Sequence, residues 1–165
     1  MPFPKKLPSA LAFFLISLPV FAGEIITVKN IGMDLARDLA NQAVLACRAK
    51  GYQVSAVVVD RSGNLRASLR DDLAASFSLE ISQRKANMAL FAGTNTGAFK
   101  KARGDIRPEL NHIAGLIVMR GGLNIMAGGN RVGAIGVSGA PGGDIDEACA
   151  KAALEKLSER LEFAD

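Results

Sequence analysis

The chain has 165 residues, a formal net charge of +4, two cysteines, one tyrosine and no tryptophan. Its lysines and arginines are scattered along the sequence, whereas nucleic-acid-binding proteins concentrate them in a patch or stripe. The basic residues are also not interleaved with tyrosine or tryptophan side chains that could stack on single strands. Two cysteines are too few for a thiolate metal cluster or a disulfide-rich scaffold. The composition excludes these classes and fits one ordinary domain.

Residues 1–22 have the pattern of a secretory signal peptide. Two lysines precede the apolar stretch LPSALAFFLISLPVF, and Val20-Phe21-Ala22 places small residues at the −3 and −1 positions of a cleavage site. A retained membrane anchor is the alternative, but two prolines interrupt an apolar run well below the ~20 residues that span a bilayer. The sequence predicts cleavage after about Ala22, a single domain over 23–165, no stable membrane insertion after cleavage, and a periplasmic or secreted location.

The first part of this domain predicts a helix followed by a hairpin. From Ile31 to Gly51 apolar residues recur four apart, which is the spacing of one helix face, and glycine is a typical residue after a helix end. In residues 52–60 the run from 54 to 59 is apolar on both faces, as in a central strand. Residues 60–64, DRSGN, have turn chemistry, and residues 65–70 alternate apolar and polar side chains. The hairpin therefore has a second strand with one wet face.

The middle of the chain predicts helices and a loop. The segment SFSLEISQRKANMALFAG, residues 76–93, has helical spacing and ends in glycine. A short helix is expected over 94–102, with Thr94 or Thr96 able to cap its start. The following stretch, RGDIRPELNH at 103–112, is irregular and contains a proline, so it is predicted to be a loop.

The last third predicts three strands and a closing helix. Strands are expected over 114–119, 123–127 and 131–138, separated by glycine pairs that suit hairpin turns. The helix begins at Asp144, three residues before Glu147, which is similar to a capping box. The predicted fold is α/β (α+β): a single antiparallel sheet of about five strands flanked by helices.

The glycine-rich stretch GAIGVSGAPGG at 133–143 raises the question of phosphate binding. A dinucleotide site needs G-x-G-x-x-G and a P-loop needs Gly-Lys-Ser/Thr, and neither pattern occurs. Asp144, Asp146 and Glu147 also place negative charge at the helix start that a phosphate would occupy. The interpretation is structural: these glycines let another backbone or a ligand approach the strand closely, and APGG forms a turn.

Four stretches together resemble one known family. VGAIGVSGAPGGDIDEACAKAAL, VSAVVVDRSGNLRASLR, SQRKANMALFAGTNT and MRGGLNI occur in the order expected for the GlcG/HbpS family, which includes the C-terminal domain of PduO-type proteins. The resemblance covers essentially the whole predicted mature chain. It implies a profilin-like or PAS-like fold, assembly into homo-oligomers, and binding of heme, with heme b as the expected cofactor.

The resemblance has two departures. Asn124 stands where the family usually has proline, which affects an edge of the expected ligand pocket. Some relatives are thought to ligate heme iron through a histidine near the N-terminus, and this chain has only His112. The axial ligand is therefore not carried over from the family.

Five residues are candidates for binding heme. Arg84 and Lys85 are adjacent cations that could flank the propionates; alternatively, Lys85 extends its stem over the edge of the core while Arg84 pairs with a nearby acid. His112 is a candidate iron ligand in an irregular segment, or a surface histidine. Thr94 and Thr96 could meet the iron through a hydroxyl, or cap a helix.

Other side chains are weaker candidates. Three methionines could supply a thioether, but their positions in apolar patterns favour packing in the core; these are Met88, Met119 and Met126. Charge runs such as Lys100-Lys101 are interpreted as solvated surface. Asp60 suits the first position of a turn better than acid–base catalysis.

Cys47 and Cys149 are a candidate disulfide. If the first and last helices run antiparallel on one face of the sheet, the end of one helix lies beside the start of the other. A bridge is then possible in an oxidising compartment. Two buried free thiols are the alternative.

The leading functional hypothesis is an exported heme-binding protein that captures, stores or relays heme. The sequence supplies no G-x-S-x-G elbow and no histidine-rich or cysteine-rich metal spacing, so an enzyme is less favoured. The alternatives are a heme-degrading or redox-active enzyme, and a protein that binds another small molecule such as a corrinoid or an organic acid.

Overall fold

The computed structural model describes residue 1 and residues 25–163. The predicted signal peptide lies outside the described residues, apart from Met1. Within the described part, no helix combines the length and the apolar character needed to cross a bilayer. The elements are, in chain order, α1 Met33–Arg48, β1 Ser55–Asp60, β2 Leu65–Arg70, α2 Ser78–Ala92, α3 Thr96–Ala102, the 3₁₀ helix η1 Gly104–Ile106, α4 Arg107–Asn111, β3 Gly122–Ala127, β4 Asn130–Ser138, α5 Gly143–Lys156 and α6 Ser158–Glu162.

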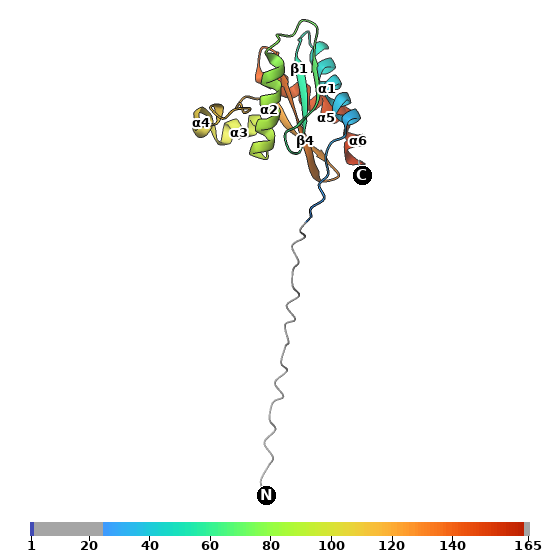
Figure 1. The fold of residues 1–165 in the computed structure, drawn as a ribbon, viewed down its shortest axis with the longest axis vertical. Helices are drawn as coiled ribbons and strands as arrows, with labels where there is room; N and C mark the ends of the chain where they lie inside the picture. The colour runs from blue at the N-terminus through green and yellow to red at the C-terminus, as the bar shows by residue number, and fades with distance from the viewer. Residues whose placement is uncertain (2–24, 164–165) are drawn as a thin grey trace.

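The described strands form one antiparallel sheet with helices on both faces. The strand order is β2-β1-β4-β3, so β1 and β4 are central and β2 and β3 are edges. α2 covers one face, and α1 and α5 lie side by side on the other (Figure 1). The predicted class, a single antiparallel sheet flanked by helices, is therefore confirmed, with four strands in place of about five.

The missing strand is the one predicted over 114–119. This segment runs as an irregular connection in which the backbone N–H of Val118 donates to the side chain of Asn111, at 2.8 Å. Val118 is fully buried in a small cluster with Met88 and Leu110. Its apolar residues are explained by this packing beneath α2 and α4, not by pairing in the sheet.

Two further boundaries differ from the sequence prediction. Residues 103–112 contain η1 and α4, because Pro108 sits in the first turn of a helix, where a missing N–H costs nothing. The closing helix is divided at Leu157 into α5 and α6. The predicted loop is therefore wrong for this segment, because the proline begins a helix here and does not break one.

The larger core lies between the sheet and the helix pair α1/α5. The α1 residues in it are completely buried at helical spacing, and the strands contribute alternate residues. Its members include Leu39, Ala43, Cys47, Val58, Ile125, Ile135, Val137, Cys149 and Ala153. A smaller cluster of Val57, Val59, Ala86, Ala89 and Ala134 joins the opposite face to α2. β1 is buried on both faces, as its continuous apolar run predicts.

The glycines of β3 and β4 allow α2 to approach the sheet closely. Gly122 and Gly136 are cross-strand partners. A Cβ at Gly136 would overlap the carbonyl oxygen of Ser82, and a Cβ at Gly122 would overlap that of Lys85. The backbone of α2 therefore packs directly on a pair of glycines, which confirms that another backbone approaches this strand.

Gly136→Ala is expected to destabilise the protein by about 1–3 kcal/mol, because one added methyl group must displace the backbone of α2. The free energy of unfolding from urea denaturation measures the effect. Gly104→Ala is the matched control, because an added Cβ there meets nothing within 4 Å. Equal stabilities of the two variants would contradict this explanation of the glycine spacing.

Candidate functional site

The five heme-binding candidates do not gather in one site. Lys85 and Thr96 are completely buried, whereas Thr94 and His112 are exposed and Arg84 is partly exposed. The two buried candidates therefore cannot share one open ligand site with the three at the surface.

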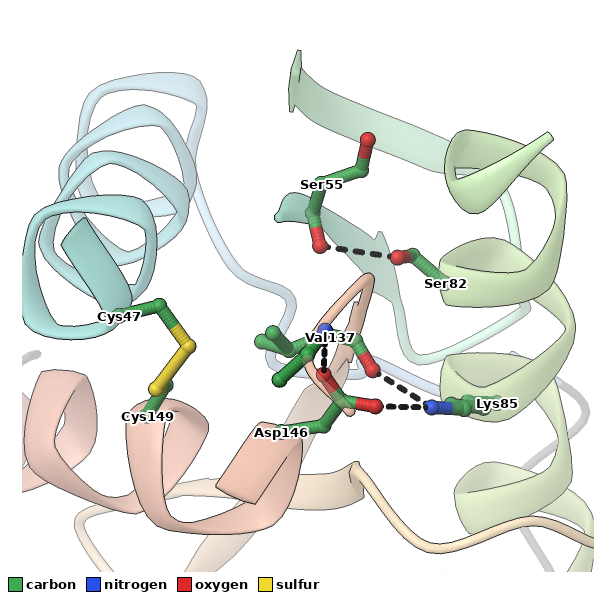
Figure 2. The surroundings of a disulfide bond; sticks show 8 residues. Cys47, Ser55, Ser82, Lys85, Val137, Asp146 and Cys149 are labelled. Atoms are coloured by element: carbon green, nitrogen blue, oxygen red, sulfur yellow. Dashed lines mark hydrogen bonds and ion pairs between the residues drawn. A yellow bond between two sulfur atoms is a disulfide. The ribbon is translucent and has the colours of Figure 1, made fainter. Parts of the chain in front are cut away.

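Lys85 forms a buried ion pair with Asp146. Its Nζ donates to Asp146 Oδ2 at 2.7 Å and to the carbonyl oxygen of Val137 at 2.9 Å (Figure 2). The two side chains are 1% and 4% exposed. Burial lowers the pKa of Lys85 and raises the pKa of Asp146, while the attraction between the two groups opposes both shifts. A propionate could reach Lys85 only by breaking this pair, so we leave Lys85 out of the proposed ligand site.

Asp146 also orders the glycine-rich turn. Its Oδ1 accepts the backbone N–H of Ala140 at 3.0 Å. The predicted capping arrangement at the start of α5 is wrong: the N-cap is Gly142, no side chain caps the helix, and Glu147 instead accepts hydrogen bonds from Arg120. This pairing joins α5 to the segment before β3.

Thr96 has a similar structural role. Its Oγ1 accepts the N–H of Gly122 at 3.0 Å and donates to the carbonyl oxygen of the same residue at 3.3 Å. The N-cap of α3 is Asn95, and no side chain caps this helix, so neither threonine makes the predicted cap. Thr96 instead fixes the first residue of the edge strand β3.

These contacts bring the family-like stretches together in the interior. The helix with Lys85, the threonine turn, the Gly121-Gly122 segment and the helix beginning at Gly143 meet around the buried ion pair. The motifs that mark the resemblance therefore specify how the elements pack. A ligand site must be formed by the exposed residues of these stretches and by segments outside them.

The exposed side of α2 borders a groove with apolar and basic walls. A cavity of 420 Å³ is lined by Arg61, Ser62, Gly63, Asn87, Leu90, Phe91, Ala114, Gly115 and Leu116. An adjoining cavity of 230 Å³ shares Asn87 and Gly115 and adds Glu80, Gln83 and Arg84. We call these two cavities together the α2 groove. Its volume is in the range of small-molecule sites.

Two features of the α2 groove, an exposed aromatic ring and an exchangeable arginine, suit a flat apolar ligand with an anionic edge, and a third, a buried amide oxygen, suits a hydrogen-bond donor. Phe91 is 60% exposed and offers an aromatic face. Asn87 donates to the carbonyl oxygen of Gly115, but its Oδ1 is buried and has no partner among the described residues. Arg84 pairs with Glu80 at the groove edge, as the alternative interpretation of Arg84 predicts. An exposed pair of this kind is weak and can exchange for an anionic ligand.

His112 and Thr94 lie at the surface. His112 ends α4, and Gly115, three residues later, lines the groove beside Arg84. Thr94 lies in the turn after α2. Among the described residues, no cluster of three or more histidine, cysteine or carboxylate side chains could hold a metal ion.

Sequence reasoning missed several residues of this region. The sequence places Arg61 in a predicted turn and Phe91 within a predicted helix, and nothing in the spacing links 61–63 to 114–116. Core packing was predicted for three methionines but holds only for Met88. Met119 and Met126 are 37% and 49% exposed.

The predicted cysteine pair is bridged. Cys47 at the end of α1 and Cys149 in α5 form a disulfide with a Cα–Cα distance of 5.4 Å (Figure 2). Both cysteines are completely buried. The bridge joins the two helices that cover one face of the sheet, as the antiparallel arrangement predicts.

The fold and its interior motifs define a class of small α/β domains with a four-stranded antiparallel sheet between α2 and an α1/α5 pair. The family model described as "Haem degrading protein HbpS-like" matches residues 31–155. The chain therefore belongs to the HbpS-like family.

Solved structures agree with this assignment. The crystal structure of HbpS is 36% identical, with a TM-score of 0.76, over 85% of this chain and 99% of that one. The Klebsiella pneumoniae protein ORFY is 27% identical, with a TM-score of 0.76, over 84% and 97%. A PduOC:heme complex is 22% identical, with a TM-score of 0.67, over 76% and 94%, and shares the fold. No curated protein matches the sequence.

Proposed function

We propose that this chain is an exported heme-binding protein that captures, stores or relays heme, with heme b as its ligand. The family description and the heme complex of a protein with the same fold support this proposal. The observation that carries it here is the α2 groove, which combines apolar walls with two arginines. Heme has the matching chemistry, a flat apolar ring with two carboxylates on one edge.

Each part of the groove would have a separate role. Phe91 and Leu116 would contact the ring, and Arg61 and Arg84 would pair with the propionates. Bound heme would supply iron, for which imidazole is a common ligand, and His112 is the side chain that could provide it. Thr94 remains a weaker candidate, because a hydroxyl is a poorer iron ligand than imidazole.

Hemin titration of the purified protein should give a saturable shift of the Soret band. Phe91→Ala is expected to weaken binding about tenfold or more, because it removes the exposed aromatic wall. Phe77→Ala is the matched control: Phe77 is 75% exposed and lies 14 residues earlier, about 21 Å along α2. His112→Ala should change the position of the Soret band if the imidazole binds iron. Binding that is equally strong in both phenylalanine variants would place heme elsewhere.

Heme degradation is the second candidate, favoured by the family description. It would appear as loss of the Soret band and release of iron under reductant or peroxide, beyond the rate for free hemin. Stable absorbance under both conditions would favour storage or relay.

Native mass spectrometry of the protein from its source compartment separates the remaining alternatives. We expect the mass of the chain without about 22 residues, the mass of bound heme, and an oligomer of identical subunits. A corrinoid or an organic acid would give a different ligand mass, and a chain of full length would contradict signal cleavage.

A further inference from the structure

A second cleft, lined by basic side chains, lies where α3, α4 and the start of α5 meet. A cavity of 510 Å³ adjoins one of 250 Å³, and the two share Lys100 and Arg120. The larger also contacts Gly97, Ala98, Lys101 and Glu147, and the smaller contacts Arg107, Met119, Gly143 and Asp144. We call this the basic cleft. It has no lining residue in common with the α2 groove.

The basic cleft has an excess of positive charge. Four cationic side chains line it, against the carboxylates of Asp144 and Glu147. Among residues 25–163, three of the cations have no carboxylate within 4.0 Å; these are Lys100, Lys101 and Arg107. A concave surface lined by one sign of charge concentrates the electric potential and attracts ions of the opposite sign.

The fourth cation, Arg120, forms a partly exposed ion pair with Glu147. Its Nε and Nη2 donate to Glu147 at 3.2 and 3.4 Å, and among the described residues its Nη1 makes no side-chain hydrogen bond. Gly97 makes room for this pair, because a Cβ there would overlap the carboxylate of Glu147. Glu147 therefore occupies one edge of the guanidinium, while the Nη1 donors remain available for a ligand.

The backbone beneath the basic cleft is also fixed. Gly121, next to Arg120, has φ of +114°, and a Cβ there would lie 2.9 Å from Asp146 Cβ and 3.1 Å from Lys85 Nζ. The buried ion pair thus supports the segment that carries Arg120. Gly143, the first residue of α5, also lines the basic cleft, but Asp144 and Glu147 offset the partial positive charge of this helix start, so the attraction for an anion comes from the four cationic side chains.

We propose that the basic cleft binds a small polyanion that carries at least two oxyanion groups, separately from heme. The positive charge and the donors of Arg120 match carboxylates or phosphates. The lining residues include four cations and no aromatic side chain, which suits a compact polyanion better than a large flat ring. Polycarboxylates and phosphate compounds share this chemistry, so both are tested.

Calorimetric titrations with pyrophosphate and with citrate distinguish the two sources. We expect saturable binding of at least one of them to the purified protein, and weaker binding as salt increases. Lys100→Ala/Lys101→Ala should weaken the binding tenfold or more. Lys50→Ala/Lys151→Ala removes the same charge from exposed positions that do not line the basic cleft, and should change binding less than twofold.

Three results would overturn the proposal. The first is no binding of either anion. The second is an equal loss in both double-lysine variants, which would show a general effect of net charge. The third is competition between the bound anion and hemin, which would make the basic cleft part of the heme site. Unchanged hemin binding in Lys100→Ala/Lys101→Ala would support two separate sites.

Discussion

Replacing Lys85 with methionine is expected to lower the free energy of unfolding by about 3–5 kcal/mol. The change leaves the Asp146 carboxylate buried without its counter-charge, although the N–H of Ala140 still donates to it. It also removes the donor to the carbonyl oxygen of Val137. Urea denaturation measures the loss. Arg84→Met is the matched control on the same helix, and because Arg84 makes only an exposed ion pair, little change is expected.

A double variant keeps this prediction testable if Lys85→Met folds poorly. In Lys85→Met/Asp146→Asn no unpaired charge is left, and the asparagine oxygen can still accept the Ala140 N–H. This protein should be more stable than Lys85→Met alone. Additive losses in the double variant would show that the two side chains are not coupled.

The single variant Asp146→Asn should depend on pH in a defined direction. Without the carboxylate, the buried Lys85 has a pKa even further below its usual value. Between that lowered pKa and the ordinary lysine pKa, the unfolded chain binds more protons than the folded protein, so stability rises with pH. The deficit relative to the unsubstituted protein should therefore be smaller at pH 9 than at pH 7. A deficit that does not change with pH would indicate that Lys85 does not carry this charge.

The buried ion pair also shows what the sequence could predict. Hydrophobic spacing predicted α1, α2, β1, β2 and β4 because their patterns depend on neighbours close along the chain. Lys85 and Asp146 are 61 residues apart, and no periodicity links them. Lysine is almost never fully buried unless paired, so an exposed or ligand-binding role was the natural interpretation.

The strand predicted over 114–119 is wrong because a local pattern was present but ambiguous. A short apolar run is compatible with a strand or with packing in the core, and periodicity alone does not distinguish the two. Here Val118 packs against Met88 and Leu110. Its backbone N–H donates to Asn111 Oδ1, which replaces the acceptor that a neighbouring strand would provide. The α2 groove and the basic cleft could not be predicted from local patterns, because each combines segments that only the tertiary structure brings together.

Replacing both cysteines with alanine is expected to cost about 2–5 kcal/mol of stability. The bridge joins residues 102 apart, and in the chain-entropy model a loop of about 100 residues contributes up to ~4.7 kcal/mol by restricting the unfolded chain. Because both cysteines are buried, replacing them with alanine also leaves two small cavities in the core between α1, α5 and the sheet, which lowers the stability further. Denaturation of the oxidised protein, the reduced protein and Cys47→Ala/Cys149→Ala separates the two contributions.

The three forms should rank in one order. The oxidised protein should be the most stable, and the reduced protein should lie above the alanine variant, because its thiols still fill the space between α1 and α5. The disulfide of the native protein should resist mild reductant. The thiol of the reductant must reach a sulfur atom that is buried until the two helices separate. Two free sulfhydryls in the denatured, unreduced protein would contradict the bridge. Equal stabilities of the oxidised and reduced forms would show that the bridge adds nothing beyond the packing of the two helices.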